Sequence, residues 1–388
     1  MKVLIAGDIC LAGRTASMTM ENIKQSLLAV VPYIQGSDYS FVNLECSVSD
    51  EISTPITKVG PNIHSDSCLL DSLFTSGFKC VTLANNHFAD FGEKAVLDSL
   101  RRIDVVGLDR VGAGKDLADA ERVMYTKMGD KCLAVINCCE HEFTVATESQ
   151  AGCNPLNPIH QYYSIQEAKK KANYVLVIVH GGSEHYPLPT PRMQEIYRFF
   201  VDAGADAVVN HHQHCYSGYE IYQGKPIVYG LGNFFFDVAK APITWNEGYF
   251  VQIDFAEKIK LNINPYMQCK EQPIIRMMDS DERTHFDAKI NQLNSIIADR
   301  EKLQDAFIKL VNKRKSEYMW DFNKHPTKWQ RRIQKIKKIL GCNKQQYNSI
   351  VLSAQKLPLL LSLYNCESHR DIMSIILQQR LENENKVF

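Results

Sequence analysis

Hydrophobic residues in the first 270 positions alternate between two kinds of pattern. Short runs rich in β-branched residues, typical of buried strands, lie at 2–6, 39–44, 79–84, 103–107, 132–137, 174–179, 205–209 and 226–231. Between several of them, apolar positions recur at helical spacing, at 64–77, 92–102, 163–172 and 191–203. This alternation predicts an α/β domain whose sheet is flanked by helices.

The pattern changes twice further along the chain. Residues 247–254 and 259–266 alternate strictly between apolar and polar positions, which predicts an antiparallel hairpin. From about residue 284 only helical spacing remains, so we place a domain boundary in the polar stretch 279–284. The expected organisation is a catalytic-type domain over 1–280 and a helical C-terminal region over 285–388.

Composition narrows the class of protein. With 45% hydrophobic and 23% charged residues, the 388-residue chain is predicted to be globular. None of its twelve cysteines is spaced C-x-x-C, and several lie in apolar runs, which favours buried thiols and a reducing compartment. The start of the sequence lacks the pattern of a signal peptide, and no apolar stretch is long enough for a transmembrane segment. We therefore expect a cytoplasmic protein.

The net charge of zero conceals two oppositely charged parts. Residues 309–344 carry ten more basic than acidic side chains, and residues 1–308 carry ten more acidic than basic ones. The stretch 329–340, WQRRIQKIKKIL, is predicted to form a basic amphipathic helix. Such a helix can bind a polyanion, an anionic membrane surface or a protein partner, or can be a solvated face that complements the acidic part.

The candidate chemistry follows the predicted strands. Five strand ends lead into side chains that can bind metals, in the segments Gly7-Asp8, Asn43-Leu44-Glu45, Asn85-Asn86-His87, His180-Gly181-Gly182 and Asn210-His211-His212-Gln213-His214. Ligands collect at the carboxyl ends of strands in α/β sheets. Each residue alone also has a structural explanation, as a turn, a cap or a buried polar group. Together, imidazoles and carboxylates favour zinc, manganese or iron, and a two-metal site of the kind that hydrolyses phosphoesters.

These motifs occur in the order that a known family has them. GD, NLE, ANNH, HGG-x-E, GAD-x-V-x-x-HHxH and YGLGNFFFD resemble the CapA capsule-synthesis proteins, the poly-γ-glutamate accessory family, which are similar to calcineurin-like metallophosphoesterases. The resemblance covers about residues 1–240. It implies a four-layer α/β sandwich that holds two divalent metal ions, here followed by the C-terminal α-helical region.

The resemblance also assigns roles to residues. It implies that Asp8 and His214 bind the first metal and that Glu45 bridges both. It implies that the second metal is bound by Asn86, His180 and His212, and that His87 is the general acid. The chain has Asp8-Ile9-Cys10 where the wider superfamily has Asp-x-His, so the first metal lacks the histidine of that motif and has one ligand fewer. Its site is expected to be weak, empty or filled only with substrate. Cys10 or Glu184 are the candidates to replace it, and Glu184 is also a candidate catalytic residue.

The leading hypothesis is a metal-dependent hydrolase of a phosphoester or a related anionic bond, linked to capsule or poly-γ-glutamate metabolism. Its substrate would be an anionic small molecule or polymer. The alternative is a non-catalytic accessory protein for polymer assembly that binds a partner through the basic C-terminal helices, and nucleic-acid processing is a third reading. A serine hydrolase is not indicated, because the sequence has no G-x-S-x-G motif.

Overall fold

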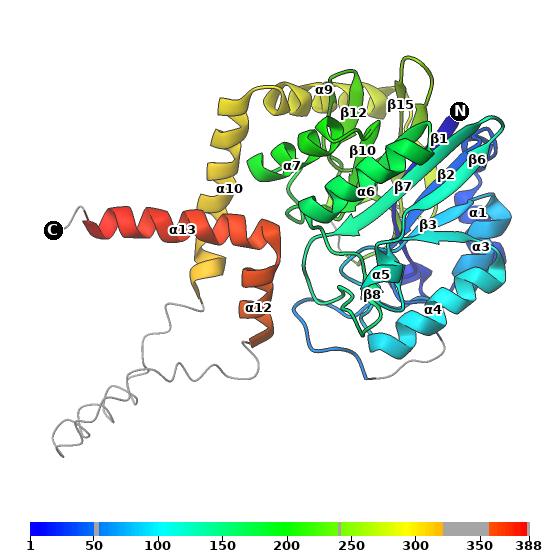
Figure 1. The fold of residues 1–388 in the computed structure, drawn as a ribbon, viewed down its shortest axis with the longest axis horizontal. Helices are drawn as coiled ribbons and strands as arrows, with labels where there is room; N and C mark the ends of the chain where they lie inside the picture. Colours follow the sequence, from blue (N-terminus) through cyan, green and yellow to red (C-terminus); the bar gives the residue numbers. More distant parts are fainter. Residues whose placement is uncertain (50–53, 240–241, 321–356, 386–388) are drawn as a thin grey trace.

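The computed structural model describes residues 1–49, 54–239, 242–320 and 357–385. Two β-sheets are stacked with helices on their outer faces, which is the predicted four-layer α/β sandwich (Figure 1). The first sheet has the order β16-β15-β14-β1-β2-β3-β4, with β13 also paired to β1, and the second has the order β11-β12-β10-β9-β7-β6.

The strands have the following bounds. The first sheet consists of β1 (Lys2–Cys10), β2 (Tyr39–Leu44), β3 (Cys80–Thr82), β4 (Asp109–Val111), β13 (Asn233–Phe236), β14 (Glu247–Asp254), β15 (Lys260–Gln268) and β16 (Ile275–Met277). The second consists of β6 (Met124–Met128), β7 (Lys131–Cys139), β9 (Tyr174–His180), β10 (Ala207–His211), β11 (Tyr219–Tyr222) and β12 (Lys225–Val228). A small sheet pairs β5 (Ala113–Gly114) with β8 (Gly152–Cys153).

The helices fall into two layers and a C-terminal group. The longer helices against the first sheet are α1 (Met20–Leu27), α3 (Cys68–Ser76) and α4 (Gly92–Val106), and those against the second are α6 (Pro158–Lys171) and α7 (Pro191–Asp202). Short helices are η1 (Gly13–Thr15), α2 (Val31–Gln35), α5 (Leu117–Ala120) and α8 (Ile243–Asn246). The C-terminal helices are α9 (Ser280–Ile297), α10 (Arg300–Trp320), α12 (Leu357–Asn365) and α13 (Glu367–Asn385).

Strand β1 shows why the strands read as continuous apolar runs. Val3 and Ile5 pack in the core shared with the second sheet, while Leu4 and Ala6 pack in the core under α1 and α3. Successive side chains of a strand point to opposite faces, and both faces of this sheet are covered, so residues 3–6 are all apolar. Strands β1 to β4 are parallel, as are β7, β9 and β10, so their carboxyl ends share one edge of each sheet.

The structure confirms most of the predicted elements and corrects one. Strand β2 and the hairpin β14–β15 form where they were expected, and α7 begins after Thr190, whose side chain accepts the Met193 N–H at 3.2 Å. The predicted strand at 103–107 is wrong, because these residues form the last turn of α4 and the bend after it. Ile103 is buried there while Val105 is 75% exposed, so the apolar run belongs to a one-sided helix.

The C-terminal helices gather at one side of the sandwich (Figure 1). Helix α9 begins with a capping box from Asp279 and Glu282, and its apolar face, with Phe286 and Leu293, joins the core between the sheets. Helices α10, α12 and α13 share a smaller apolar cluster that includes Val311 and Ile372. The division into two domains stays a prediction, and the predicted basic helix at 329–340 lies outside the described residues.

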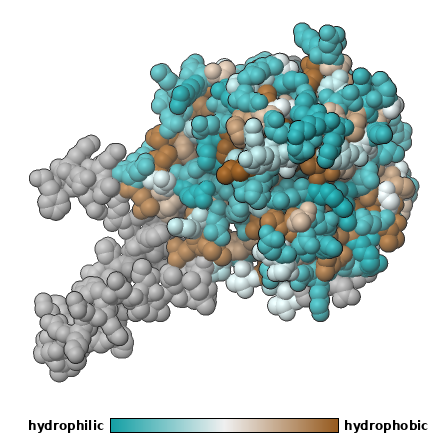
Figure 2. Space-filling model, viewed as in Figure 1, coloured by the Kyte–Doolittle hydropathy of each residue, from teal (hydrophilic) through white to brown (hydrophobic). Residues whose placement is uncertain are grey.

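The surface of the sandwich is mainly polar in the view of Figure 2, with apolar residues in scattered groups. Among the described helices, none combines the length and the hydropathy that a membrane crossing requires.

Candidate metal centre

A β-bulge in β1 brings Asp8 to the inner face of the first sheet. Gly7 is the extra residue of the bulge, because Ala6 pairs with Val42 and Asp8 with Asn43, the next residue of β2. A Cβ atom on Gly7 would lie 2.0 Å from the carbonyl oxygen of Gly232, so glycine is required at this position. Asp8 is then buried against Asn43, whose Nδ2 donates to its Oδ1 at 2.7 Å.

Two further donors come from the first sheet. Glu45 follows β2 and Asn86 lies in the loop after β3. Glu45 is fully buried, yet neither of its carboxylate oxygens has a hydrogen-bond partner among the described residues. A buried carboxylate without partners is costly unless a cation offsets its charge.

The second sheet supplies three imidazoles. His180 is the last residue of β9, and His212 and His214 follow β10. His212 and His214 have φ angles of +94° and +54°, in the left-handed region that non-glycine residues rarely adopt. Strain of this kind costs about 1–3 kcal/mol per residue and collects at functional sites. The turn places both side chains in the buried space between the sheets.

The donor atoms converge on two positions that share Glu45. His180 Nε2 lies 3.0 Å from Asn86 Oδ1, 3.1 Å from His212 Nδ1 and 3.5 Å from Glu45 Oε1. His214 Nε2 lies 3.7 Å from the same Glu45 oxygen, and Asp8, Glu45 and His214 each offer a donor atom within 4.8 Å of the others. Ligands about 2.0–2.2 Å from one tetrahedral cation lie about 3.4 Å apart, so these spacings fit a pair of divalent cations.

The pKa shifts of these side chains also fit a site for cations. Burial, together with the charge of Glu45, raises the pKa of Asp8 to about 7, and burial raises the pKa of Glu45. Burial also lowers the pKa of His180 and His212 well below the usual value, which keeps both imidazoles neutral, as metal ligands must be. For His214 burial is outweighed by the carboxylates of Glu45, Glu184 and Asp8, and its pKa is raised.

His87 lies in the loop after β3 and is held by two residues that sequence reasoning missed. Its Nδ1 lies 2.7 Å from Asp90 Oδ2 and 2.9 Å from Lys58 Nζ, and Lys58 forms a buried ion pair with Asp90. Donation of the Nδ1 proton to Asp90 leaves Nε2 for the cleft that His87 lines. Asp90 could have been found from the sequence, because it lies three residues after the histidine of ANNH. Lys58 lies in an irregular stretch without a motif or a periodic pattern.

Two asparagines outside the predicted ligand set position the histidines and the strand ends that carry them. Asn233 Oδ1 lies 2.9 Å from His214 Nδ1, so a proton donated there leaves His214 Nε2 to face Glu45. Asn210 donates to the carbonyl oxygens of Gly181, His211 and Tyr229, which ties the β9, β10 and β12 ends together. The GLGNFFFD motif therefore reaches the site through Asn233, although it reads as core packing.

The two candidate replacements for the missing histidine lie differently. Glu184 lies in the loop after β9, and the surrounding histidines outweigh burial and lower its pKa to about 2, but it belongs to neither donor group. Cys10 points away, with its Sγ 3.5 Å from Ser65 Oγ, and burial raises its pKa well above the usual value. His211 has a structural contact, since its Nε2 lies 2.9 Å from the Ala6 carbonyl oxygen.

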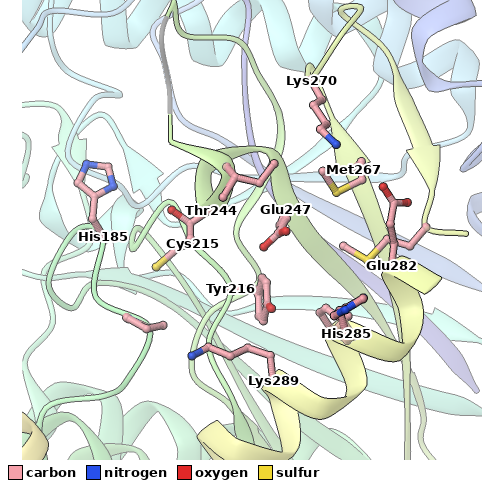
Figure 3. Close-up of a pocket in the computed structure, with 14 residues that line it drawn as sticks. His185, Cys215, Tyr216, Thr244, Glu247, Met267, Lys270, Glu282, His285 and Lys289 are labelled. Carbon is pink, nitrogen blue, oxygen red and sulfur yellow. The ribbon is translucent and has the colours of Figure 1, made fainter. Parts of the chain in front are cut away.

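Two hollows lie on either side of segment 184–187. A cleft of about 170 Å³ is lined by Asn86, His87, Glu184 and His212, and also by Arg314 of α10 and residues of α12 and α13. A larger cavity of about 480 Å³ lies beyond His185, between the β14–β15 hairpin and α9 (Figure 3). Its polar lining mixes charges of both signs, from Lys270, Lys289, Glu247 and Glu282.

Comparisons with known proteins identify the family of this chain. The family described as "Bacterial capsule synthesis protein PGA_cap" matches residues 2–238. The capsule biosynthesis protein CapA of Bacillus anthracis is 34% identical over 216 residues, which are 54% of this chain and 53% of that protein. The PGA biosynthesis protein CapA of Bacillus subtilis is 31% identical over 235 residues, or 60% of this chain and 62% of that protein. The chain thus spans less than two thirds of either relative.

Among solved structures, a phosphatase from Mycoplasma pneumoniae is similar over 74% of this chain and 98% of its own, at 15% identity and a TM-score of 0.41. The described donor groups, with the motifs in their family order and the family match over most of the sandwich, lead to one assignment. This chain belongs to the bacterial capsule synthesis PGA_cap family.

Proposed function

We propose that this protein is a metal-dependent hydrolase that cleaves a phosphoester or a related anionic bond in capsule or poly-γ-glutamate metabolism. The observation that carries the proposal is Glu45, a buried carboxylate that belongs to both donor groups and has no hydrogen-bond partner among the described residues. A carboxylate shared by two donor groups would hold two cations close together, as two-metal hydrolytic sites require.

The residues of the site have different roles in this proposed reaction. Asp8, Glu45, Asn86, His180, His212 and His214 would hold two divalent cations such as Mn, Fe or Zn. When bound, such cations would supply positive charge to a phosphoryl oxygen and would lower the pKa of water. His87 then gives the Nε2 proton to the leaving oxygen, and Asp90 keeps the ring in position. Glu184, with its low pKa, stays ionised beside the histidines.

The cleft favours an anionic substrate. Arg314 reaches it from α10 and is held by a hydrogen bond from Nη2 to the Glu184 carbonyl oxygen at 2.7 Å. A guanidinium next to a pair of cations binds phosphate or carboxylate groups. The names of the relatives, capsule and PGA biosynthesis proteins, support an anionic polymer or its building blocks as the substrate class.

Metal analysis combined with phosphodiesterase assays tests this proposal. We expect bound Mn, Fe or Zn, a gain of activity with added Mn²⁺, and loss of that gain in His180→Ala and His212→Ala. His160→Ala is the matched control, because this histidine lies on the surface of α6, paired with Glu121. Protein without bound metal and without Mn²⁺ stimulation would overturn the proposal.

A second candidate function is that of a non-catalytic accessory protein for polymer assembly. It is favoured by the Asp8 position, which has only Asp8, Glu45 and His214 as donors from the described chain. This function predicts that a polymer-assembly partner binds equally well to the wild type and to His180→Ala. A pull-down with both forms, followed by deletion of 309–344, separates the two candidates.

A further inference from the structure

A second group of metal-ligating side chains lies outside the centre described above. Glu142 follows β7, Cys366 immediately precedes α13, and His369 lies in the first turn of α13. Each offers one donor atom, and the three atoms lie within 4.8 Å of one another. Thiolate, imidazole and carboxylate together are a donor set typical of zinc.

The elements that carry these donors are held together by independent contacts. Glu140 accepts hydrogen bonds from the Ser368 N–H at 3.3 Å and from the Ser368 hydroxyl at 3.0 Å. On its other side, His141 N–H donates to Glu367 at 2.8 Å. Arg192 of α7 adds ion pairs to Glu140 and to Asp371 of α13. The three donors therefore do not depend on one another for their positions, as a preorganised site requires.

The group also borders the cleft. Glu142 and His369 line it together with Asn86, His87 and His212. Glu142 has the carboxylates of Glu184, Glu140 and Glu45 as neighbours, and burial, followed by the charge of Glu184, raises its pKa to about 8. No hydrogen bond to its carboxylate occurs among the described residues. A bound cation would offset this repulsion between carboxylates. It would also replace the proton on the Cys366 sulfur.

We propose that Glu142, Cys366 and His369 form a third cation site, for a zinc-type ion that fastens α13 to the loop after β7. Three protein donors leave one position of a tetrahedral ion open. Because two of the donors line the cleft, this position faces it and can take a water or an anionic group of a bound molecule. This proposal does not depend on whether the paired-cation centre is catalytically active.

Cobalt substitution tests the site, because a thiolate bound to Co²⁺ gives a near-ultraviolet charge-transfer absorption. The donors of the paired centre include no thiol, so that absorption reports the third site. The full chain, stripped with a chelator and reloaded with Co²⁺ alone, is expected to show it. Cys366→Ser should abolish the absorption and lower the bound cobalt by one ion per chain.

Control variants show whether the absorption comes from Cys366 and not from another residue. Cys10→Ser should retain the absorption, and so should His180→Ala, which removes a donor of the paired centre instead. Glu142→Gln keeps the thiol and the fold contacts and should weaken cobalt binding at least tenfold in a titration of the band. A wild-type protein without the absorption at saturating Co²⁺, or an absorption that survives Cys366→Ser, would overturn the third site whether or not the protein hydrolyses phosphoesters.

Discussion

His87 Nδ1 lies 2.7 Å from Asp90 Oδ2, and both side chains are almost fully buried at the carboxyl end of β3. Because its Nδ1 proton is held by Asp90, His87 can transfer a proton to a substrate only from Nε2. We expect His87→Gln to slow hydrolysis of esters with poor leaving groups by about 10²–10⁴-fold. Esters with activated leaving groups, which need no proton, should be slowed much less. Steady-state rates on both kinds of ester, with metal content measured in parallel, check this. Equal losses on both would rule out the general-acid role.

The ion pair between Lys58 and Asp90 is a stability determinant, since their side chains are only 2% and 0% exposed. Lys58→Met leaves Asp90 as a buried charge that has lost its cation. The expected loss is about 3–5 kcal/mol in the free energy of unfolding. Arg101→Met is the control, because Arg101 is 63% exposed in its pair with Asp98 and should contribute at most about 1 kcal/mol. Urea denaturation of metal-free protein gives both values, and similar losses would contradict the prediction.

Glu45 should destabilise the protein when no metal is bound. In chelator at pH 8, Glu45→Gln is expected to be more stable than the wild type by about 1–2 kcal/mol, because it removes a buried carboxylate that has no hydrogen-bond partner among the described residues. With Mn²⁺ present the order should reverse, since ligand binding stabilises only the protein that binds it. Thermal melts with and without metal measure both. A variant that is less stable in both conditions would mean that Glu45 has a structural partner.

The bulge at Gly7 should tolerate no side chain. Gly7→Ala would bring a Cβ to 2.0 Å from the Gly232 carbonyl oxygen, so β1 or β13 must shift. We expect a loss of more than about 3 kcal/mol in stability, beyond ordinary overpacking, and loss of bound metal. Gly129→Ala, in an open turn with φ +63°, should cost only the backbone strain of about 1 kcal/mol. Equal effects would show that the bulge adapts.

The capping box of α9 gives a pH dependence. Two hydrogen bonds from Arg276, at 2.6 and 2.7 Å, lower the pKa of Glu282 to about 2 from an ordinary value of 4.5. A lowered folded-state pKa contributes stability above pH 4.5, and this is lost as the pH falls towards 2. Glu282→Gln should therefore cost about 0.5–1 kcal/mol at pH 7, and the difference should shrink at pH 3. Asp287→Asn, in an exposed pair with Arg283, should change little at either pH.

The strand-end positions of the site could be read from the sequence, because apolar runs that end in Asp, Glu or His leave those side chains at one sheet edge. The supporting residues could not. Lys58 has no periodic context, and its partner Asp90 follows a different strand. Asn233 is hidden in an aromatic run that also packs the core. The contacts of His141 and Glu140 with α13 join positions about 226 apart, which no local pattern reports.

Two features of the fold could not be predicted from the hydrophobic pattern of the sequence, for physical reasons. The run at 103–107 is β-branched, so its local preference is for a strand, but it continues α4 and only one of its faces is covered. The register of β1 depends on the bulge at Gly7, and a bulge is set by the neighbouring strands rather than by the residues inside it.

Strand β1 pairs with β2 on one side and with β13 and β14 on the other. A ribosome adds roughly 5–20 residues per second, so the nascent chain carries β1 with one open edge for about 10–40 s before β13 emerges. His212 and His214 also emerge long after Asp8 and Glu45, so the metal donors cannot meet earlier. The unpaired edge of an apolar strand is a site of aggregation. Synthesis is therefore the stage at which this chain exposes an apolar strand edge that the finished fold covers.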